Sequence, residues 1–277
     1  MTMRVGSGRH FRSASWLERG VERLRGGGAR KAPPILRRLH EFVLDALPGD
    51  HLVSTLPGGE RVRLSARCRQ LSWNPEEYEA FRRVVGPGFT VLDVGANVGA
   101  YTLLFATWVG PAGHVIAFEP APASIAGLRR QLGLNGLADR VDVVEAAVAG
   151  TVGSASFACD GASGANALGT GARGARTITV ATTTIDAFCA ERGVRPDVIK
   201  IDVEGAELDV LRGARRTLAS SSVEAFIEFH PTAWTARGIT PQAMREELAS
   251  QGLAAEPLDP SIDIWKTEGI SVRLRRT

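Results

Sequence analysis

The sequence predicts an α/β fold with a mainly parallel sheet that helices cover on both faces. From Thr90 onward, short apolar runs alternate with longer segments of helical periodicity, which is typical of strand–helix–strand units. The apolar runs carry hydrophobic residues at consecutive positions, as strands do when both of their faces are buried. A glycine-containing turn follows the first of these strands, where open α/β sheets bind nucleotides.

The expected elements follow in order along the chain. Strands are expected at 90–95, 114–120, 141–148, 197–205 and 224–229, with a strand followed by a helix in 177–193 and a terminal edge strand at 271–277. Further helices are expected at 100–110, 123–136, 206–219 and 241–252. The stretch 151–176 is rich in Gly, Ala and Ser, so it is either a flexible connection or a lid over a site.

Two regions precede the main domain, which we expect to occupy residues 90–277. Residues 1–33 are basic and rich in glycine, and we expect a disordered tail there. Residues 34–89 are expected to form an extension made of a helix and a hairpin. Two alternating runs around a Pro-Gly-Gly turn predict the hairpin at 51–66, and an Asn-Pro pair predicts the start of a helix at 74–85.

The composition is that of an ordinary globular protein, with 44% hydrophobic and 23% charged residues. No apolar run reaches the roughly 18 residues of a membrane span, and the basic N-terminal segment lacks the apolar core of a secretory signal. The three cysteines, Cys68, Cys159 and Cys189, are far apart and fit a reducing compartment. We therefore expect a cytoplasmic protein with no membrane partner. The net charge of +3 is only weak support for nucleic-acid binding.

The stretch VLDVGANVGAYT at 91–102 carries the strongest functional signal. A strand ends near Asp93, and Gly95, Asn97 and Gly99 lead into a helix, so backbone N–H groups and little side-chain bulk face a ligand. Glu119, at the end of the next strand, lies 20 residues after Gly99, a spacing that suits a carboxylate receiving ribose hydroxyls. The combination predicts a nucleotide-binding turn rather than an incidental tight turn.

The turn favours S-adenosylmethionine over a dinucleotide. It reads Gly95-Ala-Asn-Val-Gly99 instead of the Gly-x-Gly-x-x-Gly of pyrophosphate sites. Asp93 would repel a pyrophosphate but attract the ammonium of a methionine moiety. A short-chain dehydrogenase would also need a tyrosine with a lysine four positions later, and neither Tyr78 nor Tyr101 has one.

Several motifs together resemble the FkbM family of class I methyltransferases. They are DVGANVGAYT at 93–102, AFEP at 117–120, IKIDVEGAE at 199–207, VLRGA at 210–214 and IEFHP at 227–231. The resemblance implies a Rossmann-like class I methyltransferase fold with seven strands, S-adenosylmethionine as donor, and O-methylation of a hydroxyl on a sugar, polyketide or other secondary metabolite. The donor site that it implies comprises Asp93, Gly95, Ala96, Asn97, Gly99, Tyr101, Thr102, Glu119, Pro120, Glu145, Ala146 and Asp202. Within this set, Glu119 is expected on the ribose and Glu145 near the adenine.

A second group of polar residues follows the later strands. Lys200, Asp202 and Glu204 share one face of a strand that should be buried, and Glu228 and His230 repeat the pattern on the next strand. Because unpaired buried charges are costly, these groups are expected at the carboxyl ends of the strands, beside the Asp93 turn.

We expect His230 to be the general base, with Asp202 or Glu228 as its partner or as the alternative base. Lys200 is expected to pair with the acids, and Glu204 and His230 to contact the acceptor. A structural ion cluster is the competing interpretation. A metal ion at Asp202, Glu228 and His230 fits their chemistry, but such clusters are commoner without one, so we expect none.

The sequence therefore favours an S-adenosylmethionine-dependent O-methyltransferase acting on a small-molecule hydroxyl. An NAD(P)-dependent oxidoreductase, a nucleic-acid methyltransferase and a non-catalytic binding module are the alternatives. Amino-methylating nucleic-acid enzymes typically carry an Asn/Asp-Pro-Pro-aromatic motif where this chain has Asp-Val-Glu-Gly, which argues against a nucleic-acid partner. The oligomeric state stays open, with a homodimer as one option.

Overall fold

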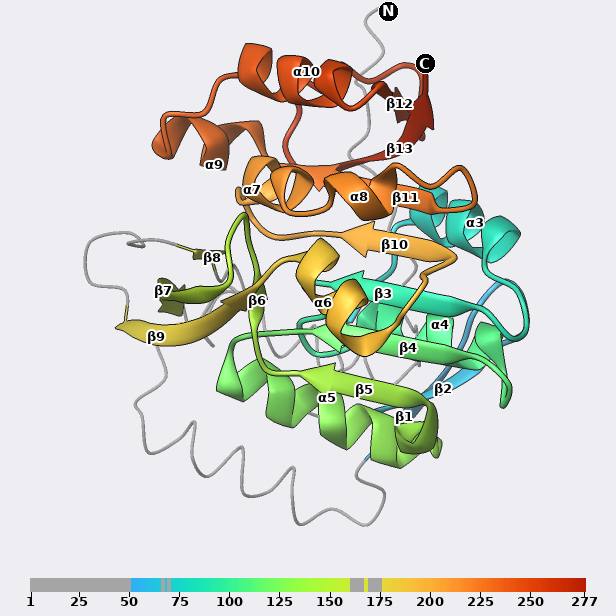
Figure 1. Cartoon of the computed structure of the whole chain (residues 1–277). Helices are drawn as coiled ribbons and strands as arrows, with labels where there is room; N and C mark the ends of the chain where they lie inside the picture. Colours follow the sequence, from blue (N-terminus) through green and yellow to red (C-terminus); the bar gives the residue numbers. More distant parts are fainter. Residues whose placement is uncertain (1–50, 66–67, 69–70, 160–166, 169–175) are drawn as a thin grey trace, which may run out of the picture.

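The computed structural model describes residues 51–65, 68, 71–159, 167–168 and 176–277, so the expected tail lies outside the described residues. A seven-stranded sheet forms the centre of the molecule, in the order β12-β13-β11-β10-β3-β4-β5 (Figure 1). Its strands are β3 (Thr90–Val94), β4 (His114–Phe118), β5 (Val141–Val144), β10 (Val198–Ile201), β11 (Glu224–Phe229), β12 (Leu253–Pro257) and β13 (Ile270–Arg276). The run from β5 to β11 is parallel, and β13 is antiparallel to both of its neighbours. The prediction of a mainly parallel, Rossmann-like sheet is confirmed.

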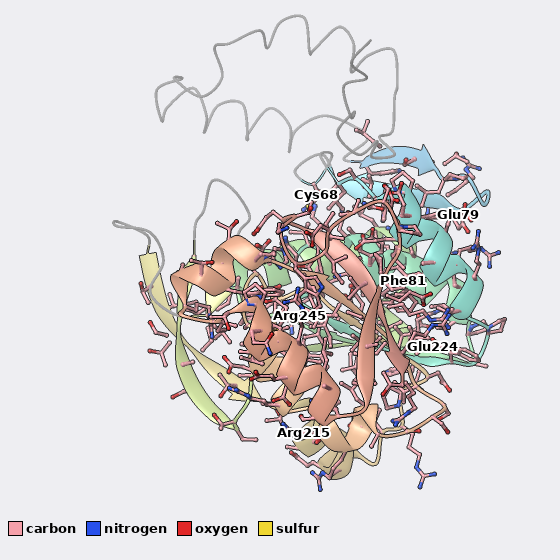
Figure 2. All side chains as sticks on the ribbon, turned by 90° about the horizontal axis from the view of Figure 1, so that it is seen from above. Cys68, Glu79, Phe81, Arg215, Glu224 and Arg245 are labelled. Carbon is pink, nitrogen blue, oxygen red and sulfur yellow. The ribbon has the colours of Figure 1, made fainter. Side chains whose placement is uncertain are left out.

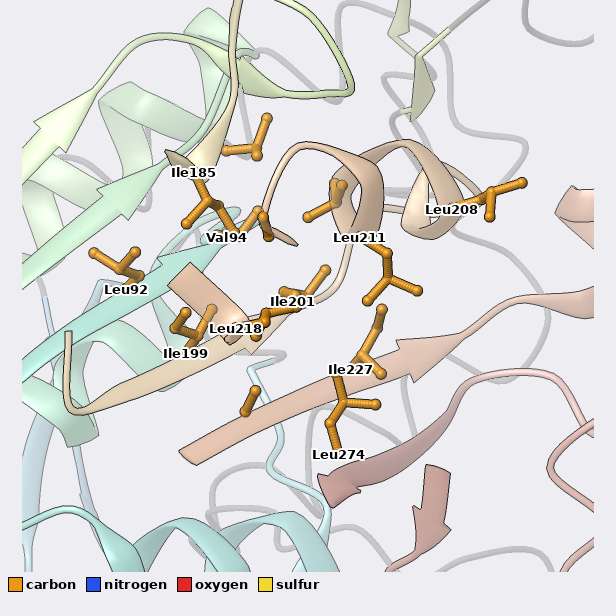
Figure 3. Packing of buried hydrophobic residues seen from close by; sticks show 14 of the residues in the cluster. Leu92, Val94, Ile185, Ile199, Ile201, Leu208, Leu211, Leu218, Ile227 and Leu274 are labelled. Atoms are coloured by element: carbon orange, nitrogen blue, oxygen red, sulfur yellow. The ribbon is translucent and has the colours of Figure 1, made fainter. Parts of the chain in front are cut away.

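Helices cover both faces of this sheet. One face is covered by α3 (Pro75–Val84), α4 (Ala100–Val109) and α5 (Pro122–Asn135). The other is covered by α6 (Ile185–Arg192), α7 (Glu207–Arg212), α8 (Arg215–Leu218) and α10 (Pro241–Ser250). Figure 3 shows the second core, where Leu92, Ile199 and Ile227 from neighbouring strands pack with Leu211 and Leu218. No helix in the described ranges is both long and apolar enough to cross a membrane.

The N-terminal extension shares a core with the main domain. The predicted hairpin is present as β1 (His51–Thr55) and β2 (Arg61–Ser65), which pair antiparallel. The predicted helix is α3, and the Asn74 side chain caps it by accepting from the N–H of Glu76 and of Glu77. Phe81 on α3 is fully buried and packs edge-to-face on Phe105 and Phe226, whereas Glu79 lies at the rim (Figure 2).

A second, four-stranded sheet stands beside the main one, in the order β6-β9-β7-β8. It consists of β6 (Ala147–Val148), β7 (Gly153–Cys159), β8 (Ala167–Leu168) and β9 (Arg176–Thr183). The prediction of one strand over 141–148 is therefore wrong, because β5 stops at Val144 and β6 joins the second sheet. Part of the stretch expected to be irregular, 151–176, is the regular strand β7, which pairs along its whole length with β9. Residues 160–166 and 169–175 lie outside the described residues, so the lid stays a prediction for them.

Three further elements differ from the sequence prediction. The terminal strand β13 is not at the edge of the sheet, because β12 pairs with its outer side. Few residues of β12 are β-branched or aromatic, so its sequence gives no strand signal. The expected helix 206–219 divides into α7 and α8 around Gly213, where a Cβ would come 2.5 Å from the carbonyl oxygen of Ala149. The short helix α9 (Pro231–Ala236) was also not expected.

The carboxyl ends of β3 and β10 meet in close backbone contact at Gly95. Lys200 lies opposite Asp93 in the parallel register, and the N–H of Asp202 donates to the carbonyl of Val94. Gly95 has φ +81°, and a Cβ there would lie 1.7 Å from the carbonyl oxygen of Asp202. Only glycine fits this junction, which brings the end of β10 against the turn after β3.

We predict that Gly95→Ala unfolds far more easily than Gly88→Ala. Both glycines have φ +81°, so both variants bear the left-handed backbone strain of about 1–2 kcal/mol. A Cβ at Gly88 meets nothing within 4 Å, whereas a Cβ at Gly95 displaces the backbone of Asp202. The extra overpacking should lower the free energy of unfolding by about 1–3 kcal/mol more, measured by urea denaturation. Equal losses of unfolding free energy in the two variants would show that the backbone of Asp202 can move away from residue 95 at no cost.

Candidate active site

A cavity that opens to solvent lies at the carboxyl ends of the strands. In Figure 1 the arrowheads of β3, β4 and β10 point toward the side on which β7, β8 and β9 lie. The cavity is lined in part by residues that the sequence analysis predicted for the site, namely Gly95, Asn97, Glu119, Pro120, Ala146, Asp202 and Glu204. It also includes Phe118, Ala147, Val148, Phe157, Leu168 and Val203, which were not predicted. Phe157 and Leu168 come from the second sheet, whose strands the sequence did not reveal.

The acidic end of β4 is held rigidly at this cavity. Glu119 is 5% exposed, and its carboxylate accepts from the N–H of Ala121 at 2.8 Å and from the N–H of Asn97 at 2.9 Å. Burial, which outweighs these two hydrogen bonds, raises the pKa of Glu119 to about 7, and the charges of Asp93 and Asp202 add to the rise. The carboxylate therefore changes charge near neutral pH while its position stays fixed.

Two cavity residues adopt a left-handed backbone conformation without being glycine. Asn97 and Glu204 both have φ 49°. A short polar side chain such as Asn tolerates this region, but a glutamate adopts it rarely. Such strain, of about 1–3 kcal/mol for a residue, is typical of functional sites. The turn after β10, which holds Glu204, is therefore shaped against local preference, whereas Asn97 suits the turn after β3.

Several predicted donor-site residues lie behind the cavity rather than on it. Gly99 starts α4, and a Cβ there would lie 2.6 Å from the Leu128 side chain, so this glycine serves helix packing. Thr102 is buried and donates its hydroxyl to Asp93 at 2.6 Å. The hydroxyl of Tyr101 donates to Glu77 on α3. These residues support the turn without lining it, and Ala96 is likewise buried.

The structure does not bring Glu145 to the cavity. The side chain of Glu145 is 55% exposed and forms an ion pair with Arg129 at 2.7 Å. Because the chain leaves the main sheet after Val144, the side chain at 145 points to solvent. The prediction that Glu145 lies near the adenine is not supported by this geometry.

Lys200 is buried between two carboxylates at the junction of β3 and β10. Its Nζ lies 3.3 Å from Asp202 and 3.7 Å from Asp93, and it sits over the ring of Tyr101. Burial opposes its charge, but Asp202 and Asp93 outweigh burial and raise the pKa of Lys200. Burial raises the pKa of Asp93, although Lys200 and Thr102 oppose the rise. Asp93 Oδ1 has no hydrogen-bond partner among the described residues, which leaves one buried acceptor beside the glycine turn.

His230, which directly follows β11, has a partner that the sequence analysis missed. Its Nδ1 lies 2.8 Å from Glu207, at the start of α7. Glu207 is fully buried and also accepts from the N–H of Gly205 and the indole N–H of Trp234. A buried carboxylate with three donors fixes the orientation of the imidazole. The glutamate stands in the motif IKIDVEGAE, but its spacing from His230 gave no sign of this contact.

The other ring nitrogen of His230 faces three carboxylates. Nε2 lies 3.6 Å from Glu204, 3.6 Å from Glu228 and 3.9 Å from Asp202. Burial disfavours the charged ring, but the hydrogen bond to Glu207 and the neighbouring acids Glu228 and Asp202 outweigh it and raise the pKa of His230 to about 11. Without a further cation at the site, His230 therefore holds its proton at neutral pH.

Known proteins place this chain in a family. The model of the FkbM methyltransferase domain matches residues 93–253, which is more than half of the chain. The 31-O-demethyl-FK506 methyltransferase FkbM of Streptomyces tacrolimicus is 48% identical over 56 residues, a match that covers 20% of this chain and only 21% of that protein.

Two solved structures are similar to this chain at low sequence identity. An FkbM methyltransferase from Methylobacillus flagellatus is 17% identical with a TM-score of 0.44, over 71% of this chain and 50% of that one. An rRNA methylase from Streptococcus thermophilus is 10% identical with a TM-score of 0.45, over 72% of this chain and 93% of that one.

The residues present fit a bound S-adenosylmethionine. Glu119 offers a fixed carboxylate to the ribose hydroxyls, and the negative charge of Asp93, whose Oδ1 accepts no hydrogen bond and lies 3.7 Å from Lys200 Nζ, suits a cationic ammonium rather than a pyrophosphate. The match to the FkbM methyltransferase domain argues against an NAD(P)-dependent oxidoreductase. This chain belongs to the FkbM methyltransferase family.

Proposed function

We propose that this chain is an O-methyltransferase that acts on a hydroxyl of a small-molecule acceptor, such as a sugar, a polyketide or another secondary metabolite. The observation that carries the proposal is the cluster of Asp202, Glu228 and His230, which adjoins the donor cavity. A hydroxyl must lose its proton as it is methylated, and an anionic cluster favours that loss.

The donor, when bound, supplies a methyl group on a positively charged sulfur. In the transfer, the acceptor oxygen forms a bond to the methyl carbon, the carbon–sulfur bond breaks with its electron pair left on sulfur, and the hydroxyl proton passes to the cluster or to water. This reaction is governed largely by positioning. The rigid Gly95–Asp202 junction, which joins the donor turn to the cluster, supplies such positioning.

We assign one end of the cavity to the methyl donor and the other to the acceptor, from the residues that line each end. Asp93, Gly95, Asn97 and Glu119 would hold the donor, because they form the turn and the acidic strand end. Phe157 and Leu168 give the cavity an apolar wall from the second sheet, which suits an organic acceptor.

The FkbM relative from Streptomyces tacrolimicus is named for O-methylation of a small molecule, and this supports the same class of acceptor here. The alternative partner is a nucleic acid, since an rRNA methylase shares the fold. A labelled methyl donor offered with RNA and with a panel of sugar and polyketide alcohols distinguishes the two. Methylation of RNA alone would contradict our proposal.

We predict that donor affinity depends on the charge of Glu119. The raised pKa of this carboxyl, about 7, means that it holds a proton below that pH and accepts ribose hydroxyls fully only above it. Affinity measured by calorimetry should therefore increase as the pH rises through 7. In Glu119→Gln this increase should disappear, and affinity at pH 8 should fall by about 10–100-fold, as expected for hydrogen bonds to a charged group.

Glu145→Gln is the matched control, because this glutamate follows the next strand but faces solvent. Its donor affinity should equal that of the wild type at every pH. A Glu119→Gln variant that binds the donor as tightly as wild type would remove Glu119 from the site.

We predict that His230→Ala and Asp202→Asn separate catalysis from donor binding. Asn has nearly the same shape as Asp and keeps the backbone contact of residue 202 with Gly95, and His230 lies outside the turn, so donor affinity should stay close to the wild-type value. His230 can accept a proton only after it gives up the one that it holds at neutral pH; if this neutral form is the base, His230→Ala lowers the single-turnover rate by about 10²-fold or more. If Asp202 is the base and His230 orients it, Asp202→Asn has the larger effect. Wild-type rates in both variants, with donor saturating, would make the cluster structural.

A further inference from the structure

The carboxylates that face the Nε2 atom of His230 lie beyond normal hydrogen-bond distance. The Nε2 atom of this histidine makes no hydrogen bond within the described part of the chain, because its contacts to Glu204, Glu228 and Asp202 are all 3.6 Å or longer. The ring is 5% exposed, so water reaches it poorly. A buried nitrogen thus points at three carboxylate oxygens across a gap.

The other side of the ring has the arrangement that orients metal-binding histidines. Such histidines almost always give their second ring N–H to a carboxylate or carbonyl, which sets the tautomer and the direction of the free nitrogen. Glu207 fills this place at 2.8 Å from Nδ1, and it is itself held by Trp234 and Gly205. Glu207 points no oxygen at the gap, so it serves as a positioning residue.

The separations of the donor atoms match one shared ion. One atom each from Asp202, Glu228 and His230 lie within 4.8 Å of one another. Two atoms that bind a single divalent ion at about 2.1–2.3 Å lie roughly 3–4.5 Å apart. The 4.8 Å limit is slightly above that range, so the carboxylates of Asp202 and Glu228, whose side chains are 28% and 21% exposed, would have to rotate slightly toward His230 to share one ion.

The balance of charges at the site also favours a bound cation. Lys200 supplies one positive charge, but its ammonium is shared between Asp202 Oδ2 and Asp93. Among the described residues, the ion pairs of Glu204, Glu207 and Glu228 are with His230, and Glu228 also feels the charge of Lys200. The negative charge of these acids and Asp202 is therefore only partly compensated by the described residues.

We propose that Asp202, Glu228 and His230 ligate a divalent metal ion, with Glu207 as the positioning residue for His230. The sequence analysis expected no metal because such clusters are commoner without one, and the Glu207 contact, which only the structure shows, is the reason to propose one. One imidazole and two carboxylates suit Mn²⁺ or another first-row ion that accepts mixed nitrogen and oxygen ligands. The proposal rests on the proposed function, and it narrows the acceptor to a molecule whose two neighbouring oxygens can chelate the ion, which would lower the pKa of the reacting hydroxyl.

The test is a titration of the chelator-treated full chain with Mn²⁺, in which the loss of the free-ion electron paramagnetic resonance signal reports binding. Wild type should bind one ion. Glu228→Gln should bind at least about 10-fold more weakly, and Glu207→Gln should lose about 10–100-fold, as second-layer changes at such sites do. Thermal unfolding of each variant shows that it is folded.

Asp142→Asn is the matched control, because Asp142 also pairs with a histidine, His114, at 3.0 Å, but without further acids at that histidine. It should bind Mn²⁺ as the wild type does. No binding by wild type, or equal binding by wild type and Glu228→Gln, would overturn the proposal.

Methyl transfer is measured separately on the same samples. Transfer that is unaffected by a chelator, in a chain that binds no Mn²⁺, would refute the metal site and leave the methyltransferase function intact. Tight Mn²⁺ binding that Glu228→Gln abolishes would establish the site even if no alcohol in the panel were methylated.

Discussion

The buried charge of Lys200 is the constraint on which the site depends. Its ammonium joins Asp93 at the end of β3 to Asp202 at the end of β10, and these strands meet at a glycine that leaves no room for a side chain. Removing one partner of a buried ion pair leaves an uncompensated charge and is strongly destabilising, by about 3–5 kcal/mol. The lysine thus ties the donor turn to the acidic cluster, so both ends of the site share one rigid junction.

The N-terminal extension takes part in the same network. Glu77 on α3 is buried and accepts from the hydroxyls of Tyr101 and Ser271. Burial raises the pKa of Glu77 to about 7, the charge of Glu228 adds to this rise, and Lys200 opposes it. Because α3 also fills the core through Phe81, residues before Thr90 support the site instead of merely preceding the domain.

Sequence reasoning succeeded where a local pattern determines the geometry. The glycine turn, the acidic end of β4 and the charged ends of β10 and β11 each follow from one strand's periodicity, and the structure gathers them at one edge. It failed where the geometry depends on a long-range contact. Nothing near Glu207 shows that it reaches His230, and Phe157 stands in a Gly- and Ser-rich stretch with no strand signal. Glu145 was expected near the adenine because the sequence does not show that the chain leaves the main sheet after Val144.

A structure with S-adenosylhomocysteine bound tests the central claim most directly, that donor turn and acidic cluster form one site. The account predicts that the ribose hydroxyls lie within hydrogen-bond distance of Glu119, with the amino-acid end at the turn after Asp93. The sulfur should face Asp202 and His230 across the cavity. A ribose bound away from Glu119, or a sulfur directed away from the cluster, would contradict it.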